Sequence, residues 1–168
     1  MFVITDQVET PGTYYAGWGE MLESDVWDLQ SHTAAGHDLQ ETSEGEFPVL
    51  TSRADHEDRG EWVERVTADL DRADRAIRES TGRRPVAFAY PFGAWGVDRT
   101  NDPAIVWGLA AILQERYALA FHQDDQEDMV LAGPSDLPLL IRRLQVGDWT
   151  GAELLEQISA AADRTPTA

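Results

Sequence analysis

Short apolar segments alternate with helical patterns along the whole sequence, and this alternation restricts the possible folds more than any other feature. Apolar or alternating runs predict strands at residues 1–5, 26–31, 86–90, 117–121 and 139–146. Periodic apolar positions and capping residues predict helices at residues 18–22, 62–82, 103–116 and 150–162. Strands that alternate with helices are typical of an α/β domain with a mostly parallel sheet or barrel.

The segment between residues 32 and 58 differs from this pattern. It is polar and contains Gly36, Gly45 and Pro48, which favour turns. We therefore predict a long loop with at most a short turn of helix, and long loops in compact domains often carry function. The helices that follow have clear boundary signals, because Gly82 is a typical C-terminal cap and Asp102 is a plausible N-cap in front of Pro103.

The charge of the chain excludes several kinds of partner. Its 13 basic residues, all arginine, stand against 31 acidic ones and give a net charge of −18. Such a charge repels phosphate backbones and anionic membranes, so we predict no binding to nucleic acid. No apolar run approaches the about 18 residues of a transmembrane helix, and the chain as written carries no export signal. Cysteine is absent, so a metal would need histidine and carboxylate ligands.

Two histidines, His32 and His37, lie at the start of the polar loop with four residues between them. Neither a straight helix nor a straight strand brings residues at this spacing together. The rings converge only if His32 ends a strand and the chain bends sharply, and Gly36 supplies the flexibility for such a bend. A converging pair would suit a divalent metal. The alternative is a pair of capping or surface histidines.

Further candidates follow the predicted strands, at the positions where parallel α/β folds gather their working residues. Pro91 and Gly93 break the strand at 86–90, although a turn alone also explains them. His122 ends the next strand and could serve as a proton donor. Trp95 and Trp149 could form an apolar wall against a sugar, or they could be packing aromatics.

Several segments together resemble one family. Residues 2–5 resemble its second strand, and the segment from Ser31 to His37 resembles its two-histidine metal motif. Residues 81–86 and Tyr90-Pro91-Phe92-Gly93 resemble its third motif, and residues 140–150 resemble its late strand and the start of the next helix. The family is that of the polysaccharide deacetylases, also called NodB-homology domains or carbohydrate esterase family 4. The spacing of the histidines resembles the branch that deacetylates poly-N-acetylglucosamine.

The resemblance implies a distorted (β/α) barrel and a hydrolase that removes N-acetyl groups from poly-N-acetylglucosamine or a chitin-like polysaccharide. It implies that His32 and His37 bind a divalent metal, Zn²⁺ first, with Co²⁺, Ni²⁺ or Mn²⁺ as alternatives, and that an aspartate is the third ligand. It also implies that Arg143 orients a general base, although a structural ion pair would explain this arginine equally well. The oxyanion or substrate would be bound by Tyr90, Phe92, Gly93 and Trp95.

The sequence also departs from the family. The family has an earlier strand with the motif Thr-Phe-Asp-Asp-Gly, whose first aspartate is the general base and whose second is the third metal ligand. This chain has no such strand, and Asp124-Asp125 lies too late in the sequence and without the following glycine. We therefore expect residues 1–162 to form a partial deacetylase domain that lacks its first strand, with a disordered tail at 163–168.

Three functional hypotheses follow. The first is the larger, C-terminal part of a metal-dependent polysaccharide N-deacetylase that acts outside the cytoplasm, as the family usually does, with weak or no activity as this chain stands. The second is a non-catalytic remnant of the same fold that binds a carbohydrate or a protein partner. The third is an acidic interaction protein, which would explain the net charge of −18 but not the order of the motifs.

Overall fold

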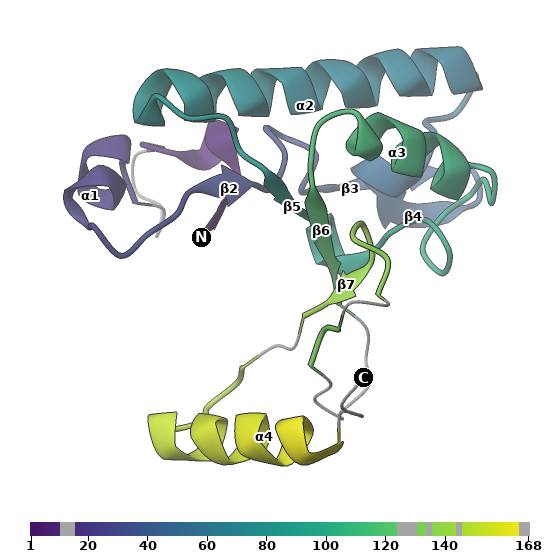
Figure 1. The fold of residues 1–168 in the computed structure, drawn as a ribbon. Helices are drawn as coiled ribbons and strands as arrows, with labels where there is room; N and C mark the ends of the chain where they lie inside the picture. Colours follow the sequence, from purple (N-terminus) through teal and green to yellow (C-terminus); the bar gives the residue numbers. More distant parts are fainter. Residues whose placement is uncertain (11–15, 124–130, 134–135, 144–145, 165–168) are drawn as a thin grey trace.

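Five parallel strands form the central sheet of the computed structural model, which describes residues 1–10, 16–123, 131–133, 136–143 and 146–164 (Figure 1). The strand order is β1-β2-β5-β6-β7, so β1 and β7 lie at the edges of this sheet. The predicted α/β class with a mostly parallel sheet is confirmed. The five strands are β1 (Phe2–Val3), β2 (Gln30–Ser31), β5 (Ala87–Ala89), β6 (Leu119–His122) and β7 (Ile141–Arg142).

The long helix α2 (Arg59–Thr81) lies across one face of the sheet, at the top of Figure 1. It begins at a capping box between Asp58 and Glu61 and ends at the left-handed cap Gly82, as the sequence predicted for its C-terminus. Its apolar face is fully buried, and α3 (Ile105–Gln114) packs beside it. The residues of α2 in the core are Trp62, Val66, Leu70, Ala73 and Ile77.

The remaining helices are shorter or lie further from the sheet. They are α1 (Trp18–Glu23), α4 (Gly151–Arg164) and the 3-10 helices η1 (Thr5–Gln7), η2 (Val49–Thr51) and η3 (Pro91–Gly93). Helix α4 lies at the opposite end of the molecule from α2 (Figure 1). It includes the first two residues of the predicted tail, and residues 165–168 of that tail lie outside the described residues.

The predicted long loop at 32–58 is wrong in its central part. This segment contains an antiparallel hairpin of β3 (Leu39–Thr42) and β4 (Gly45–Pro48) before η2. The helix predicted at 103–116 begins at Ile105, because Asp102 caps a preceding turn through the amide of Ala104. The strands of the sheet are also shorter than predicted, because pairing with a neighbour, and not the apolar run itself, sets their ends.

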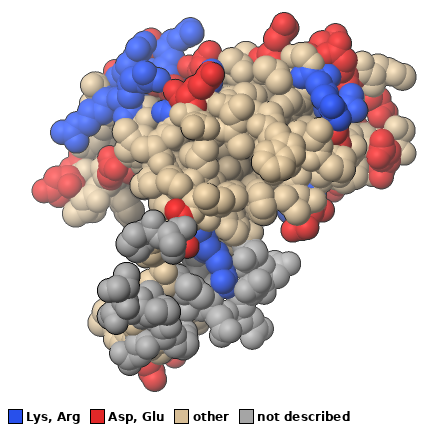
Figure 2. Space-filling model, turned by 45° about the vertical axis from the view of Figure 1, so that its right-hand side comes forward, with Lys and Arg blue, Asp and Glu red and all other residues tan. Residues whose placement is uncertain are grey.

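The arginines lie in separate groups on an otherwise acidic molecule. Figure 2 shows two blue groups at opposite ends of the upper part, with a broad uncharged surface between them. In the part of the chain that the structure describes, no helix is long and apolar enough to cross a membrane. The carboxyl ends of the five parallel strands lie along one edge of the sheet. Several candidate site residues of the sequence lie at or directly after these strand ends.

Candidate functional site

The predicted site residues lie at the carboxyl ends of neighbouring parallel strands. His32 directly follows β2, Tyr90 follows β5, His122 is the last residue of β6, and Arg143 directly follows β7. The strand order places β5 between β2 and β6, with β7 beyond β6. Residues from four distant parts of the sequence are therefore brought to the same edge of the sheet.

The ring of His32 is held by the neighbouring strand. Its Nδ1 lies 2.7 Å from the carbonyl oxygen of Ala89, and because a carbonyl only accepts, Nδ1 must carry the hydrogen. The side chain is buried, and burial lowers its pKa to about 4. The imidazole is therefore neutral at neutral pH, with the lone pair of Nε2 available to a metal.

His37 lies against His32 in spite of the spacing between them. The two ring centroids are 4.7 Å apart and the rings meet edge to face, while the ring centroid of Phe92 lies 4.4 Å from that of His37. The predicted sharp bend after β2 is present, but Gly36 does not provide it. The bend is at Thr33, which has a φ of 73°.

Gly36 has a different role from the predicted one. A Cβ at this position would lie 3.2 Å from Cγ2 of Thr33 and 3.3 Å from Oδ2 of Asp69. Such contacts are closer than ordinary van der Waals distance, so a side chain here would require Thr33 or Asp69 to shift by a few tenths of an ångström. The sequence identified the residue, but the reason is packing and not backbone freedom.

The turn after β5 provides backbone groups near the histidines. In η3 the N–H of Gly93 donates to the carbonyl of Tyr90 at 3.0 Å, so this donor is already used within the turn. Phe92 has a left-handed conformation with φ 55° and ψ 15°. Of the residues that the resemblance implies for the oxyanion or substrate, Gly93 thus has its amide engaged within the turn.

The side chain of Tyr90 points into the core and not toward the histidines. Its hydroxyl donates to the carbonyl of Leu139 at 3.0 Å, and burial raises its pKa. Trp95 packs against the same core, and its ring centroid lies 6.0 Å from that of His122. Tyr90 therefore contributes its backbone to this edge of the sheet, while Trp149, beside α4, is 36% exposed.

Arg143 reaches from the end of β7 to the end of β5. Its Nη2 donates to the carbonyl of Tyr90 at 3.3 Å, and its backbone amide donates to the carbonyl of His122 at 2.8 Å. Its Nε is buried and meets no hydrogen-bond partner among the described residues, and burial lowers its pKa. A half-buried guanidinium whose Nε is buried and open as a donor is a suitable partner for a carboxylate.

The described residues do not contain a complete set of metal ligands. No group of three or more His, Asp or Glu side chains that could hold a metal occurs among them. His32 and His37 are two adjacent nitrogen ligands, and Asp124 and Asp125 lie outside the described residues. Two imidazole nitrogens suit a divalent metal, but a metal site would need at least one further ligand.

Comparison with known proteins assigns this arrangement to a family. A sequence profile described as "Polysaccharide deacetylase" matches residues 1–105. The chain belongs to the polysaccharide deacetylase family. The resemblance of its motifs to this family is confirmed. No match was found among curated protein sequences.

Three solved structures share the fold of this chain. A de-N-acetylase from Aggregatibacter actinomycetemcomitans has a TM-score of 0.68 at 16% identity, over 93% of this chain and 63% of that chain. IcaB from Ammonifex degensii has a TM-score of 0.65 at 22% identity, over 96% of this chain and 60% of IcaB. The BpsB deacetylase domain from Bordetella bronchiseptica has a TM-score of 0.59 at 21% identity, over 84% of this chain and 53% of that domain. The predicted deacetylase fold is confirmed, and the chain spans 53% to 63% of the length of these structures.

One part of the site could not be found from the motifs. Asp69, in the middle of α2, accepts hydrogen bonds from two backbone amides of the loop between the histidines. On a helical pattern it looks like any other charged residue of a solvated face. The only signal in the sequence is its place three residues from Val66, on the border of the apolar face of the helix.

Proposed function

We propose that this chain forms the metal-binding and acetyl-binding part of a polysaccharide N-deacetylase. The main support is the geometry of the two imidazoles. His32 is neutral and oriented through Nδ1 by the carbonyl of Ala89, and His37 lies 4.7 Å away between centroids. A histidine ligand whose other nitrogen is held by a carbonyl is typical of metal sites in proteins.

The proposed metal is Zn²⁺, with Co²⁺, Ni²⁺ or Mn²⁺ as alternatives, because neutral imidazole suits all of these ions. When bound, the ion would polarise an acetamide carbonyl and lower the pKa of a bound water. The third ligand in this proposal is an aspartate carboxylate from outside the described residues.

The residues of the chain have separate roles in amide hydrolysis. The N–H of Phe92 would donate to the oxyanion that forms from the acetyl carbonyl, a contact that stabilises charge developing in the transition state. The guanidinium of Arg143 would hold the carboxylate that acts as general base, and its buried Nε supports this role. His122, next to Trp95, is the candidate donor of a proton to the leaving amine.

The proposed substrate is an N-acetylated polysaccharide of the poly-N-acetylglucosamine or chitin type. The proposal rests on the family and on neighbours whose names identify them as a de-N-acetylase and a deacetylase domain. Trp95 and Trp149 would give the sugar an apolar wall. We also propose that the protein acts outside the cytoplasm, where such polymers are found at cell surfaces.

A second candidate function is favoured by the incomplete ligand set. Because the described residues supply no third metal ligand, the chain could bind a carbohydrate or a protein partner without hydrolysing an amide. We propose that the base and the third ligand belong to a strand with two consecutive aspartates, and that the 168-residue chain alone is weakly active or inactive. An in-frame segment of this kind before the Met1 codon would support the proposal, whereas an in-frame stop codon would contradict it.

Zn²⁺ binding and acetate release test these functions together. We expect the chain to bind Zn²⁺ and the variants His32→Gln and His37→Gln to lose this binding. His56→Gln is the matched control, because His56 is exposed and lies outside the site. Acetate release from N-acetylglucosamine oligomers by the unextended chain would exclude the non-catalytic function. Equal Zn²⁺ binding by the wild type and His32→Gln would contradict the metal site.

A further inference from the structure

The loop between the two histidines is held by hydrogen bonds from two sides, and helix α2 lies on one of these sides. We propose that Asp69 is a positioning residue for the metal site, which keeps the peptide between His32 and His37 in the conformation that brings the rings together. The inference rests on the proposed function, because it assigns the residue a part in metal binding. It concerns a side chain that neither ligates a metal nor contacts a substrate.

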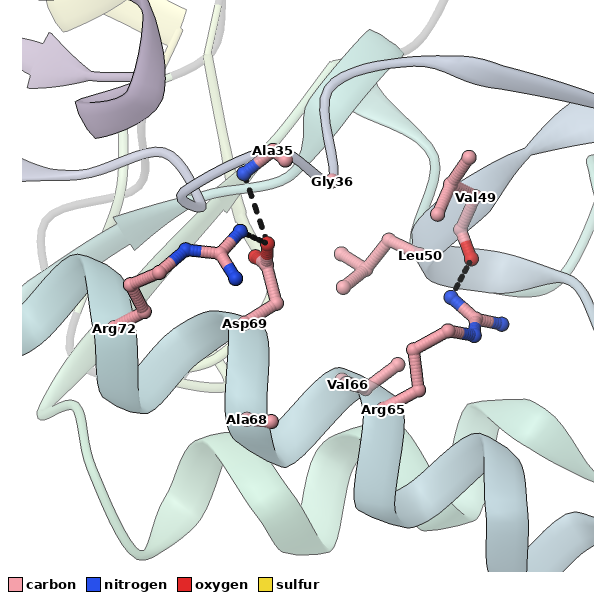
Figure 3. A pocket seen from close by; sticks show the side chains of 9 residues that line it. All are labelled: Ala35, Gly36, Val49, Leu50, Arg65, Val66, Ala68, Asp69 and Arg72. Atoms are coloured by element: carbon pink, nitrogen blue, oxygen red, sulfur yellow. Dashed lines mark hydrogen bonds and ion pairs between the residues drawn. The ribbon is translucent and has the colours of Figure 1, made fainter.

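Asp69 binds two consecutive amides of the loop. Ala34 donates to Oδ2 at 3.0 Å and Ala35 donates to Oδ1 at 2.8 Å. Figure 3 shows the carboxylate pointing from α2 toward Ala35, at one end of a cavity of about 320 Å³. The Asp69 side chain is 14% exposed. Ala34 is buried, so water competes little for its amide, whereas Ala35 is exposed.

The carbonyls of the same loop are held from the opposite side. The amide of Thr5 donates to Thr33 at 3.2 Å, and the amide of Asp6 donates to Ala34 at 3.1 Å. These donors belong to η1, which follows β1. The loop is therefore held between η1 and α2, and Asp69 accepts two hydrogen bonds from it on the α2 side.

This hold matters because the loop has an unfavourable backbone conformation. Thr33 has a φ of 73°, and a left-handed conformation costs a residue with a Cβ about 1–2 kcal/mol. A β-branched residue rarely adopts it unless its surroundings enforce it. If the amides of Ala34 and Ala35 were released, Thr33 would relax to a negative φ and His37 would move away from His32.

Arg72 connects the two sides. Its guanidinium lies 3.2 Å from Oδ1 of Asp69 and 3.0 Å from Oδ2 of Asp6. Its side chain is 52% exposed, so the ion pairs contribute little stability by themselves. Arg65, in the same cavity, is bonded to Val49 and leaves Asp69 to the loop (Figure 3). The role of Arg72 is thus to orient the carboxylate of Asp69.

The variant Asp69→Asn tests the inference, with Asp71→Asn as its matched control. Asp71 lies on the same helix, pairs with Arg116, and is 54% exposed. Asparagine keeps one acceptor oxygen for the loop but turns an amide group toward the second N–H. We expect Asp69→Asn to bind Zn²⁺ about 10- to 100-fold more weakly by calorimetry, and Asp71→Asn to bind it like the wild type.

Two further measurements separate positioning from stability. Urea unfolding gives the folded fraction of each variant, because a residue that is only structural lowers this fraction without changing the Zn²⁺ affinity of the folded chain. Nuclear Overhauser contacts between the rings of His32 and His37 report their distance without a metal. We expect these contacts to weaken in Asp69→Asn and to persist in Asp71→Asn.

Zn²⁺ affinity within twofold of the wild type in folded Asp69→Asn, or unchanged ring contacts, would overturn the inference. If the wild type itself bound no Zn²⁺, the proposed metal site would fail, and the ring contacts alone would still decide whether Asp69 positions the loop. If Asp69→Asn does not fold, Asp69→Glu replaces it, because it keeps the charge at a shifted position. Weaker Zn²⁺ binding and weaker ring contacts in Asp69→Glu would then support the inference, and unchanged values would overturn it.

Discussion

Replacing Gly93 by alanine should destabilise the protein through one close contact between the turn after β5 and the end of β6. An added Cβ would lie 2.5 Å from the carbonyl oxygen of Gln123 and 2.6 Å from its Cβ. Both atoms belong to or adjoin the backbone, so they cannot move aside as the tip of a flexible side chain would. The residue also has a φ of 69°, which disfavours alanine.

These two effects can be estimated separately. The left-handed conformation costs alanine about 1–2 kcal/mol, and forcing extra volume into a packed site costs about 1–3 kcal/mol. Gly93→Ala should therefore lower the free energy of unfolding by about 2–5 kcal/mol. In a domain of this size that corresponds to a decrease in Tm of roughly 4–20 °C.

Gly82→Ala is the matched control for this prediction. Gly82 has a φ of 72°, close to that of Gly93, but nothing lies within 4 Å of an added Cβ. The control should therefore lose only the about 1–2 kcal/mol of the conformational effect. Urea unfolding followed by tryptophan fluorescence measures both variants. Equal losses in the two variants would refute the reasoning, because the contact with Gln123 would then cost nothing.

Three further predictions concern buried polar groups. Because burial lowers the pKa of His32 to about 4 from 6.5, the unfolded chain takes up a proton between these pH values that the folded chain does not. The metal-free wild type should thus lose up to about 3 kcal/mol relative to His32→Gln as the pH falls from 7 to 4 in urea unfolding; parallel curves would contradict this. Asp102→Asn should lower stability in thermal melting by about 1–3 kcal/mol, since Asp102 accepts a charged hydrogen bond from Arg59 at 2.8 Å, and an unchanged Tm would be evidence against that bond. Tyr117→Phe should raise the pKa of Asp74 further in a carboxyl NMR titration, because the lost hydrogen bond of 2.7 Å favours the carboxylate; a lower pKa would show the opposite.

Features that depend on neighbouring residues could be predicted from the sequence. The apolar period of α2 and the cap at Gly82 are local, and the structure confirms both. The spacing of His32 and His37 left open whether their rings converge, because it allowed this only with a strand end and a sharp bend, and the structure places the ring centroids 4.7 Å apart.

Features that depend on distant partners could not be predicted in this way. The hairpin of β3 and β4 consists largely of polar residues such as Gln40 and Glu46, whose weak strand preference is offset by their pairing. The turn at Gly45, with a φ of 132°, was its one local signal. The role of Asp69 depends on amides 34 and 35 positions earlier in the chain, a relation that no local pattern contains.

The bond between His32 and Ala89 joins the side chain that follows one strand to the backbone of the next strand. A local fluctuation that breaks the pairing of β2 with β5 would therefore change the orientation of this imidazole while the helices are still folded. If the proposed metal site is correct, metal affinity would then fall before helical structure is lost, while the circular dichroism of the protein still looked unchanged.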